Sequence, residues 1–158
     1  MKRPWNLIDT PVYSLATMHN GQANMNICTY VTAVSMQPKM YAIAVYHGSL
    51  SLQYMQQSTQ AVLQLLQHDQ YGIVPALGKK SGHIYNKINY LTKKNMLTSW
   101  EQHSVLTHAA AYLLLTINSC HTTGDHDLYT CTVTKYKSHP QPQPLTFQQL
   151  ITRKIILG

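Results

Sequence analysis

Alternating apolar and polar residues along the first third of the chain predict β-strands joined by tight turns. Residues 9–18 predict the first strand, and the Asn20-Gly21 pair after it is typical of a hairpin turn because it tolerates a positive φ. Residues 23–34 are rich in Thr, Val and Tyr and predict a second strand, or a strand followed by a loop. Residues 39–46 carry apolar side chains on both alternating faces, which predicts a strand buried on both sides.

The rest of the chain mixes short helices with further strands. Residues 49–58 predict a short helix, because Leu52 and Met55 are three positions apart and Ser51 stands near the start. The Ala-Leu run within residues 108–119 has helical propensity, but its Leu-Thr-Ile end and the turn after it favour a strand. The other predictions are a strand at 61–66, a helix within 68–78 that Pro75 limits, a loop at 78–82, a hairpin turn at 122–127, a strand at 128–136, an extended spacer at 139–144 and a strand or short helix at 145–157.

These elements predict a mainly β fold with a few short helices, in the form of a six-stranded antiparallel barrel that is closed or nearly closed. The length of 158 residues suits a single domain, residues 1–158, that buries a hydrophobic core without disulfides or a structural metal. A barrel of this size holds one small ligand or presents a ligand site on its outer face.

The composition places the chain among globular proteins that do not cross a membrane. Hydrophobic residues make up 44% of it, and no apolar run approaches the ~20 residues that a membrane-spanning helix needs. The first six residues lack the apolar region of a secretory signal, so we expect a cytoplasmic protein.

Few residues carry charge, and acids are especially scarce. The net charge is +7 although only 11% of residues are charged. Paired-carboxylate catalysis has one candidate pair, Asp125 with Asp127, and both lie in the predicted turn. The positive excess suits an anionic ligand or nucleic acid, although most individual lysines are expected to be ordinary surface residues.

The cysteines and histidines form no recognisable reactive or metal-binding motif. Cys28, Cys120 and Cys131 fit no zinc pattern, and the nine histidines include no pair four positions apart. Cys120 and Cys131 are expected to face each other across the predicted hairpin, as a disulfide or, as a cytoplasmic location favours, as two reduced thiols. Nucleophile-elbow, phosphate-loop and dinucleotide-binding glycine motifs are also missing, so no metal is expected and hydrolase chemistry lacks its usual residues.

Five short segments, taken in order along the chain, carry the main functional signal. They are Asn24-Met25-Asn26-Ile27-Cys28-Thr29-Tyr30, Ser35-Met36-Gln37-Pro38, Ser49-Leu50-Ser51, Ser81-Gly82 with Lys87, and Gly124-Asp125-His126. Together they resemble the flavin reductase-like family over residues 11–136. The resemblance implies a split barrel of Greek-key topology that binds flavin mononucleotide (FMN), and a homodimer with the FMN near the subunit interface.

The resemblance also implies which residues touch the cofactor, namely Asn24, Tyr30, Ser51, Lys87 and His126. A flavin pocket needs backbone amides beside the ring, an aromatic wall, and hydroxyl and cationic groups at the phosphate. Residues 21–38 are therefore expected to form the pocket wall. The backbone beside the ring is expected to come from Asn26, Ile27, Cys28 and Thr29.

Each of these side chains also has a purely structural interpretation. Tyr30 suits a core position, and Ser51 suits the cap of a short helix. Lys87 suits a solvated surface among neighbouring lysines, and His126 suits a turn. Cys28 is expected to be a small apolar filler and not a redox thiol.

The leading functional hypothesis is an FMN-dependent oxidoreductase that accepts hydride from NADH or NADPH and reduces free flavin or another small acceptor. Such chemistry suits a chain poor in carboxylates, because the cofactor carries the reaction. No catalytic residue is expected, and His126 has at most a positioning role. The alternatives are a non-enzymatic FMN-binding electron carrier or flavin-storage protein, and a basic barrel that binds nucleic acid. The last is disfavoured because basic and aromatic residues do not interleave along one strand.

Overall fold

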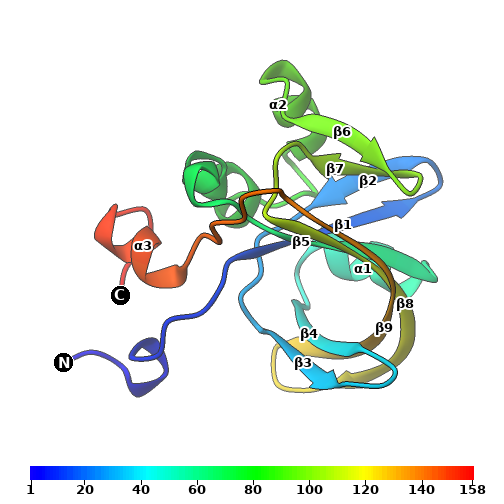
Figure 1. Ribbon diagram of the computed structural model, residues 1–158, viewed down its shortest axis with the longest axis horizontal. Helices are drawn as coiled ribbons and strands as arrows, with labels where there is room; N and C mark the ends of the chain where they lie inside the picture. Colours follow the sequence, from blue (N-terminus) through cyan, green and yellow to red (C-terminus); the bar gives the residue numbers. More distant parts are fainter.

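The computed structural model describes residues 1–158 and shows one strongly curved sheet, a small hairpin and several short helices (Figure 1). The strands are β1 Tyr13–His19, β2 Gln22–Met25, β3 Val31–Ser35, β4 Met40–Tyr46, β5 Gln60–Leu65, β6 Leu97–Trp100, β7 His103–Leu106, β8 Ala111–Thr122 and β9 His126–Ser138. The α-helices are α1 Leu50–Gln56, α2 Lys87–Lys93 and α3 Phe147–Thr152, and shorter helical turns are η1 Pro4–Asn6, η2 His68–Ile73 and η3 Pro75–Lys79. The prediction of a mainly β fold with a few helices is confirmed.

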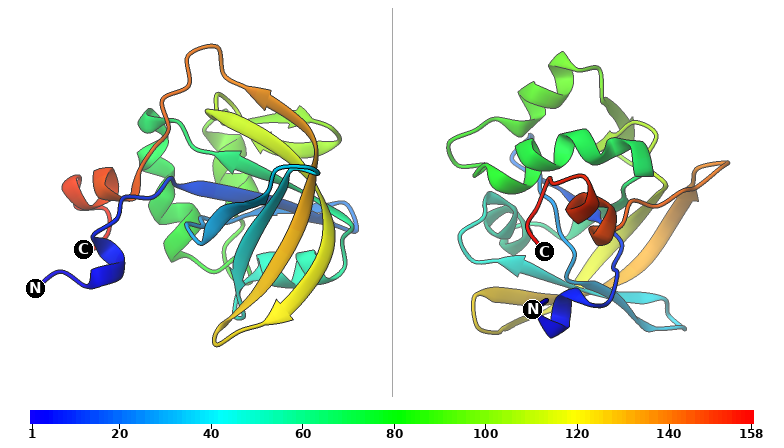
Figure 2. Two further views of the ribbon diagram at one scale, coloured as in Figure 1. Left: turned by 60° about the horizontal axis from the view of Figure 1, so that its bottom comes forward. Right: turned by 90° about the vertical axis from the view of Figure 1, so that its left-hand side faces the viewer.

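Seven strands form one antiparallel sheet in the order β2-β1-β5-β8-β9-β4-β3, and β6 pairs only with β7. The long β8–β9 hairpin bends across the molecule, as the left view of Figure 2 shows. No ladder joins the two edge strands, β2 and β3. The prediction of six strands in a closed or nearly closed barrel is therefore corrected to an open sheet of seven strands with a separate hairpin.

The predicted strand at residues 23–34 is divided in two. The side-chain Oδ1 of Asn26 accepts a hydrogen bond from the backbone N–H of Leu15 at 2.9 Å, in place of a backbone ladder bond. Cys28 then exchanges two backbone hydrogen bonds with Tyr13, at 2.8 and 2.9 Å, as an isolated bridge. A polar side chain thus ends β2 and leaves residues 26–30 as a pinned, extended segment.

The β8–β9 hairpin has a different register from the one expected. Cys120 lies opposite Tyr129, and Cys131 lies opposite Ile117, with an irregularity between Ile117 and Ser119. All three cysteines are free thiols. The expectation that Cys120 and Cys131 face each other is wrong, because the turn is centred one residue earlier than the composition suggested.

Two hydrophobic clusters hold the sheet and its surroundings together. One lies between the sheet and the helical side of the molecule and includes Val62, Leu77, Leu91 and Leu106. The other includes Leu15, Ile43, Leu63 and Leu115, from β1, β4, β5 and β8. The right view of Figure 2 shows α3 close to both termini, with the helical turns of residues 68–79 beside it and α2 at the top of the molecule.

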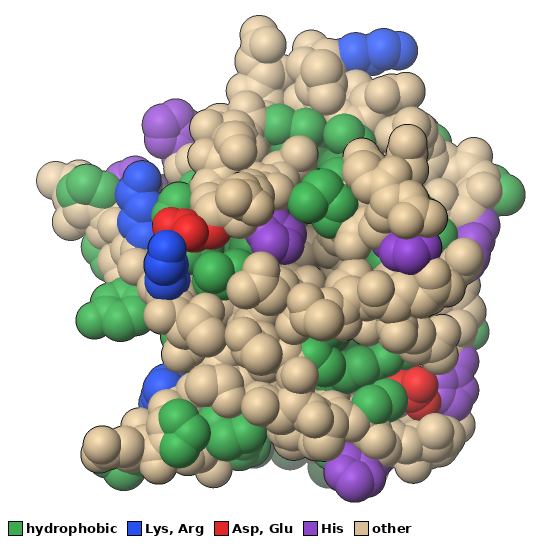
Figure 3. All heavy atoms as spheres, turned by 90° about the vertical axis from the view of Figure 1, so that its right-hand side faces the viewer, with side chains coloured by type: hydrophobic (Ala, Val, Ile, Leu, Met, Phe, Trp, Pro, Cys, Tyr) green, Lys and Arg blue, Asp and Glu red, His purple; other side chains and the backbone are tan.

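Two short capped helices lie in segments with weak sequence patterns. Residues 86–95, for which no element was predicted, contain α2, which is capped by the side chain of Asn86. Residues 145–157, predicted as a strand or a short helix, contain α3, whose Thr146 and Gln149 form a reciprocal capping box. No helix combines the length and the apolar character that a membrane crossing requires. Charged side chains are sparse on the face shown in Figure 3, in keeping with the 11% of charged residues.

Candidate functional site

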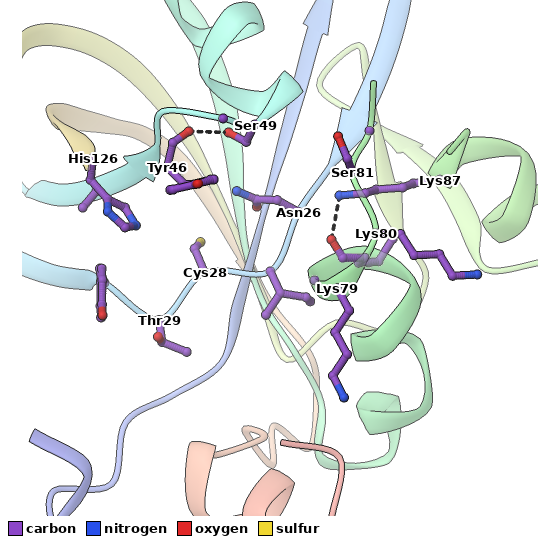
Figure 4. Close-up of a pocket in the computed structure, with 17 residues that line it drawn as sticks. Asn26, Cys28, Thr29, Tyr46, Ser49, Lys79, Lys80, Ser81, Lys87 and His126 are labelled. Carbon is purple, nitrogen blue, oxygen red and sulfur yellow. Dashed lines mark hydrogen bonds between the residues drawn. The ribbon is translucent and has the colours of Figure 1, made fainter. Parts of the chain in front are cut away.

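A cavity of about 480 Å³ lies where the pinned segment 26–30 meets the start of α1 and the turn after η3. Tyr46 and His126 lie at one end of it, and Lys87 lies at the other, with the backbone of residues 26–29 between them (Figure 4). The lining residues are Asn26, Ile27, Cys28, Thr29, Tyr30, Ala44, Tyr46, Gly48, Ser49, Leu77, Gly78, Lys79, Lys80, Ser81, Gly82, Lys87 and His126.

The segment 26–30 offers backbone groups to this cavity. Cys28 fixes it to β1, and the carbonyl of Tyr30 accepts a hydrogen bond from the N–H of Ala44 at 2.9 Å. The N–H groups of Ile27 and Thr29 and the side-chain NH₂ of Asn26 have no protein partner. The wall is therefore tied to β1 and β4 by hydrogen bonds but keeps free donors, which a polar ligand edge can use. The expected wall was residues 21–38, but only residues 26–30 of it line this cavity. Residues 31–35 form β3, which lies on the edge of the sheet.

Cys28 is buried in this wall. Burial raises the pKa of its thiol to about 12, so the thiol stays protonated at neutral pH. This agrees with an apolar filler and not with a reactive thiolate.

Three rings form the aromatic end of the cavity. The ring of His126 lies 5.1 Å from that of Tyr30 and 5.7 Å from that of Tyr46, between centroids. The side chain of Tyr30 is 64% exposed, so it is not a core residue. Large aromatic side chains that remain accessible beside a cavity provide a surface on which a flat ligand can pack.

Hydrogen bonds to aspartates fix two histidines near this end. His126 Nδ1 lies 2.6 Å from Asp125 Oδ1, and His47 Nε2 lies 2.8 Å from Asp127 Oδ1. These hydrogen bonds hold the pKa values of both carboxyls below their ordinary range. Each aspartate therefore serves a different histidine, and the two do not form a carboxylate pair for acid–base catalysis.

Lys87 is buried at the opposite end, with only 6% of its surface exposed. Its Nζ donates a hydrogen bond to the carbonyl of Leu77 at 2.7 Å, and no other protein partner accepts its remaining protons. Burial lowers the pKa of Lys87 to about 8. The interpretation of Lys87 as a solvated surface lysine is wrong. No aspartate or glutamate lines the cavity, so a buried cation faces it without a counter-charge.

Two glycines let the chain pack closely around the cavity. A Cβ on Gly82 would meet Asn24 Oδ1 at 2.8 Å and Leu50 Cβ at 3.0 Å. A Cβ on Gly78 would meet Ile27 Cβ at 3.2 Å. Gly78 brings η3 against the segment 26–30, and Gly82 brings the turn after η3 against β2 and α1.

Asn24 and Ser51 lie outside the cavity lining. Both are buried, and Asn24 Nδ2 donates to Ser51 Oγ at 3.1 Å. The helix cap is Ser49, whose Oγ accepts from the N–H of Leu52 at 3.1 Å and donates to the carbonyl of Tyr46 at 2.8 Å. The structural interpretation of Ser51 as the cap therefore applies to Ser49, and the cofactor contacts of Asn24 and Ser51 stay predictions.

The structure brings seven of the nine predicted site residues to one cavity, namely Asn26, Ile27, Cys28, Thr29, Tyr30, Lys87 and His126. Sequence reasoning missed Tyr46, Lys79 and Lys80, and it named Ser49 and Ser81 within the functional segments without assigning them a contact. A serine two positions before Ser51, at the start of the predicted helix, was a usable signal for Ser49. The lysines had no comparable signal, because a loop lysine looks the same at a site and on an open surface.

Several solved structures share this fold. FMN-binding protein from Thermus thermophilus superimposes with a TM-score of 0.77 at 16% identity, over 91% of this chain and 82% of that one. Nitrilotriacetate monooxygenase component B from Mycobacterium thermoresistibile gives a TM-score of 0.76 at 19% identity, over 89% and 76%. NADH:FAD oxidoreductase SgcE6 from Streptomyces globisporus gives 0.76 at 15% identity, over 89% and 77%.

Sequence comparison identifies the family directly. No curated protein sequence matches the chain. The family described as Flavin reductase like domain matches residues 5–154, which is nearly the whole chain and includes every residue of the cavity. The resemblance seen in the five short segments is confirmed, and the chain belongs to the flavin reductase-like family.

Proposed function

We propose that this chain is a flavin-dependent oxidoreductase that holds FMN in the cavity, takes hydride from NADH or NADPH and reduces free flavin or another small acceptor. The observation that carries the proposal is the polarity of the cavity. Accessible aromatic rings stand at one end, and the buried, unneutralised ammonium group of Lys87 stands at the other. Membership of the family and the names of the structural neighbours support it.

The donor set of the cavity fits the parts of FMN. The free N–H groups of Ile27 and Thr29 and the amide of Asn26 suit the polar edge of the ring. The rings of Tyr30 and Tyr46 suit its apolar faces. Lys87 suits the phosphate, which carries close to two negative charges, and it lines the cavity together with Lys79, Lys80 and Ser81.

Bound flavin would supply the redox chemistry, by accepting a hydride and passing electrons on. The residues of this chain bind the flavin and orient it. The pinned segment 26–30 fixes the ring plane, Lys87 fixes the phosphate end, and His126, held by Asp125, shapes the aromatic end where a nicotinamide can approach. No protein acid or base is needed for hydride transfer, which agrees with a cavity free of carboxylates.

The test is a spectrum followed by a turnover assay. Protein reconstituted with FMN and freed of excess should retain a flavin spectrum. Addition of NADH or NADPH should bleach it, and free FMN should sustain nucleotide oxidation in air. Failure to bind FMN, FAD or riboflavin contradicts the proposal. Flavin binding with no oxidation of either nucleotide leaves the alternative of an electron carrier or flavin-storage protein.

We also propose that the chain forms a homodimer, as the family resemblance implies. Tyr30, Val34 and Met36, on and beside the edge strand β3, are 64%, 52% and 91% exposed, and such a row of apolar side chains suits a subunit contact. Light scattering after gel filtration tests it: a dimer mass is expected, and a monomer mass at micromolar concentration contradicts it.

A further inference from the structure

The ring of Tyr46 lies directly against Gly48 at the aromatic end of the cavity. A Cβ on Gly48 would meet Tyr46 Cε1 at 2.8 Å and Cζ at 3.4 Å, and both residues line the cavity. Gly21 is the only glycine with a positive φ, so the backbone does not require a glycine at position 48. The missing side chain of Gly48 therefore provides space, and the ring of Tyr46 fills it.

The turn that carries these two residues is fixed at several points. Ser49 donates twice to the carbonyl of Tyr46, from its N–H at 3.1 Å and from its Oγ at 2.8 Å, and Figure 4 marks the second bond. The N–H of His47 donates to the carbonyl of Asp125 at 2.9 Å, and His47 Nε2 lies 2.8 Å from Asp127 Oδ1. The backbone of the turn is therefore tied to the β8–β9 hairpin and to the start of α1.

Only packing holds the ring of Tyr46 itself. Its hydroxyl group makes no hydrogen bond to the protein, and the residue is 55% exposed. The ring of His126 lies 5.7 Å away between centroids, and Asp125 holds His126 in place. A side chain added at position 48 would therefore displace the ring of Tyr46 and leave the backbone of the turn where it is.

We propose that Gly48 and Tyr46 together decide how wide a molecule can lie over the flavin in the cavity. This inference rests on the proposed function, which puts the flavin ring beside residues 26–29 and makes free flavin an acceptor. With the ring of Tyr46 against Gly48, the cavity keeps its volume of about 480 Å³ and has room for a tricyclic acceptor. Because both residues line the cavity, a side chain at position 48 pushes the ring into it, and only a narrower molecule still fits.

Binding to the FMN-loaded protein tests the proposal without turnover. Lumiflavin has the tricyclic ring of flavin but no phosphate, so it reports on the space over the bound FMN. Calorimetry should give a dissociation constant for lumiflavin about tenfold higher in Gly48→Ala than in the wild type, the scale of a lost ring contact. Equal affinity in the two proteins, tighter binding by the variant, or no binding to the wild type overturns the proposal.

Steady-state turnover gives a second readout. In Gly48→Ala the KM for free FMN should rise about tenfold, while kcat and the rate at which NADH reduces the bound flavin stay within about threefold of wild type. This split is expected because nicotinamide presents a single ring and needs less width than flavin. A lower kcat and a slower reaction with NADH, at an unchanged KM for FMN, would show a general distortion of the site and contradict the proposal.

Further substitutions show whether Gly48 acts through Tyr46. Once Tyr46→Ala has removed the ring, adding Gly48→Ala should change the KM for FMN by no more than about twofold. A further tenfold rise would show that the new methyl group blocks the acceptor directly, and the role of Tyr46 would be overturned. Gly124→Ala is the matched control, because a Cβ there meets nothing within 4 Å and Gly124 does not line the cavity.

Tyr46→Trp covers the case in which Gly48→Ala does not fold, because the position is more than half exposed and tolerates a larger ring. The wider indole exceeds the space over Gly48 and should weaken lumiflavin binding in the same direction, and unchanged binding would contradict the proposal. Circular dichroism and the dissociation constant for FMN show whether each variant keeps its fold and its flavin site.

The outcomes separate this inference from the function beneath it. If no flavin binds in the cavity, or if bound FMN accepts no hydride from either nucleotide, the proposed function itself fails. If the wild type reduces free flavin and Gly48→Ala does so with the same KM, only the specificity role of Gly48 and Tyr46 fails.

Discussion

The ammonium group of Lys87 donates to the backbone carbonyl of Leu77 at 2.7 Å, from a position that is almost fully buried. Lys87 is also the first residue of α2, where the helix dipole disfavours a cation. Burial and position therefore both act against the charge, and one carbonyl only partly offsets them. A phosphate bound in the cavity would supply the missing partner.

Replacement of Lys87 by methionine should weaken FMN binding by about tenfold to a hundredfold, the usual size of a lost hydrogen bond to a charged group. Riboflavin, which has no phosphate, should bind the variant and the wild type with similar affinity. Fluorescence titration measures both. Lys93→Met is the matched control, since Lys93 is an exposed residue at the other end of α2. An equal loss of affinity for riboflavin and FMN would show that the phosphate does not bind at this end of the cavity.

The affinity for FMN should fall as pH rises through about 8, because burial lowers the pKa of Lys87 to about 8 and the neutral amine loses its attraction for phosphate. The phosphate, with a second pKa of about 6, stays charged throughout. We expect a loss of roughly tenfold between about pH 7 and pH 9.5. The Lys87→Met variant should show no such slope, and a slope that persists in it would assign the titration to another group.

The lowered pKa of Lys87 also affects stability, which should rise with pH where the affinity for FMN falls. The pKa of Lys87 lies below its ordinary value of 10.5, so the unfolded chain binds more protons between about pH 8 and that value. The free energy of unfolding contributed by Lys87 therefore rises with pH across this window. In the absence of ligand, chemical denaturation should show this rise in the wild type relative to Lys87→Met.

Local sequence patterns predicted the elements that depend mainly on residues close together in the chain. The two-sided apolar alternation of residues 39–46 gave β4, and the spacing of Leu52 and Met55 gave α1. The break between β2 and β3 could not be predicted, because it depends on the contact of Asn26 with Leu15 in another strand. The number of strands in the sheet and the hairpin β6–β7 depend in the same way on partners that are distant in sequence.

Prediction of the site from the sequence has the same limit, because contacts between distant residues are not visible in it. The family resemblance placed Tyr30, Lys87 and His126 at one site, and the needs of a flavin pocket added residues 26–29; the structure has all of them at one cavity. The resemblance could not show that Asn24 and Ser51 are buried outside the lining of this cavity and hydrogen-bonded to each other, since a buried polar pair and a ligand-binding pair have the same residue types. Burial of Lys87 was also invisible, because its carbonyl partner, Leu77, lies in another element.

Replacement of Ser51 by alanine should reduce stability and leave FMN affinity within about twofold of wild type. The change leaves Nδ2 of Asn24 buried without a partner, which costs about 1–3 kcal/mol. Urea denaturation and an FMN titration on the same protein distinguish the two effects. Ser138→Ala, at an exposed position on β9, should change neither. A large loss of FMN affinity in a variant of normal stability would restore Ser51 as a cofactor contact.

Replacement of Gly82 by alanine should destabilise the protein by about 1–3 kcal/mol, because the new Cβ meets both Asn24 and Leu50 and forces one of them to move. For a chain of this size, that corresponds to a fall in Tm of about 2–4 °C per kcal/mol. Gly124→Ala is the control, since a Cβ there meets nothing within 4 Å. Similar melting temperatures for the two variants would show that the turn after η3 yields without cost.

Replacement of His126 tests whether this residue positions the substrates or transfers a proton. Phenylalanine keeps a ring between Tyr30 and Tyr46 but cannot titrate, whereas alanine removes the ring. If His126 acts by packing, His126→Phe should keep the rate of flavin reduction by NADH within about threefold of wild type. His126→Ala should lower that rate about tenfold, the scale of a lost aromatic contact. Stopped-flow absorbance of the flavin measures both rates.

The pH profile of the same variants decides between the two roles. A positioning role predicts parallel profiles for the wild type and His126→Phe, because no proton at this residue takes part in the rate-limiting transfer. A proton-transfer role predicts that both variants are equally impaired and that both lose a pH dependence which the wild type shows. Asp125→Asn gives a further check, because Asp125 holds His126 by a hydrogen bond. If His126 acts by positioning, this variant should change the rate only to the extent that the imidazole ring turns away from Tyr30 and Tyr46.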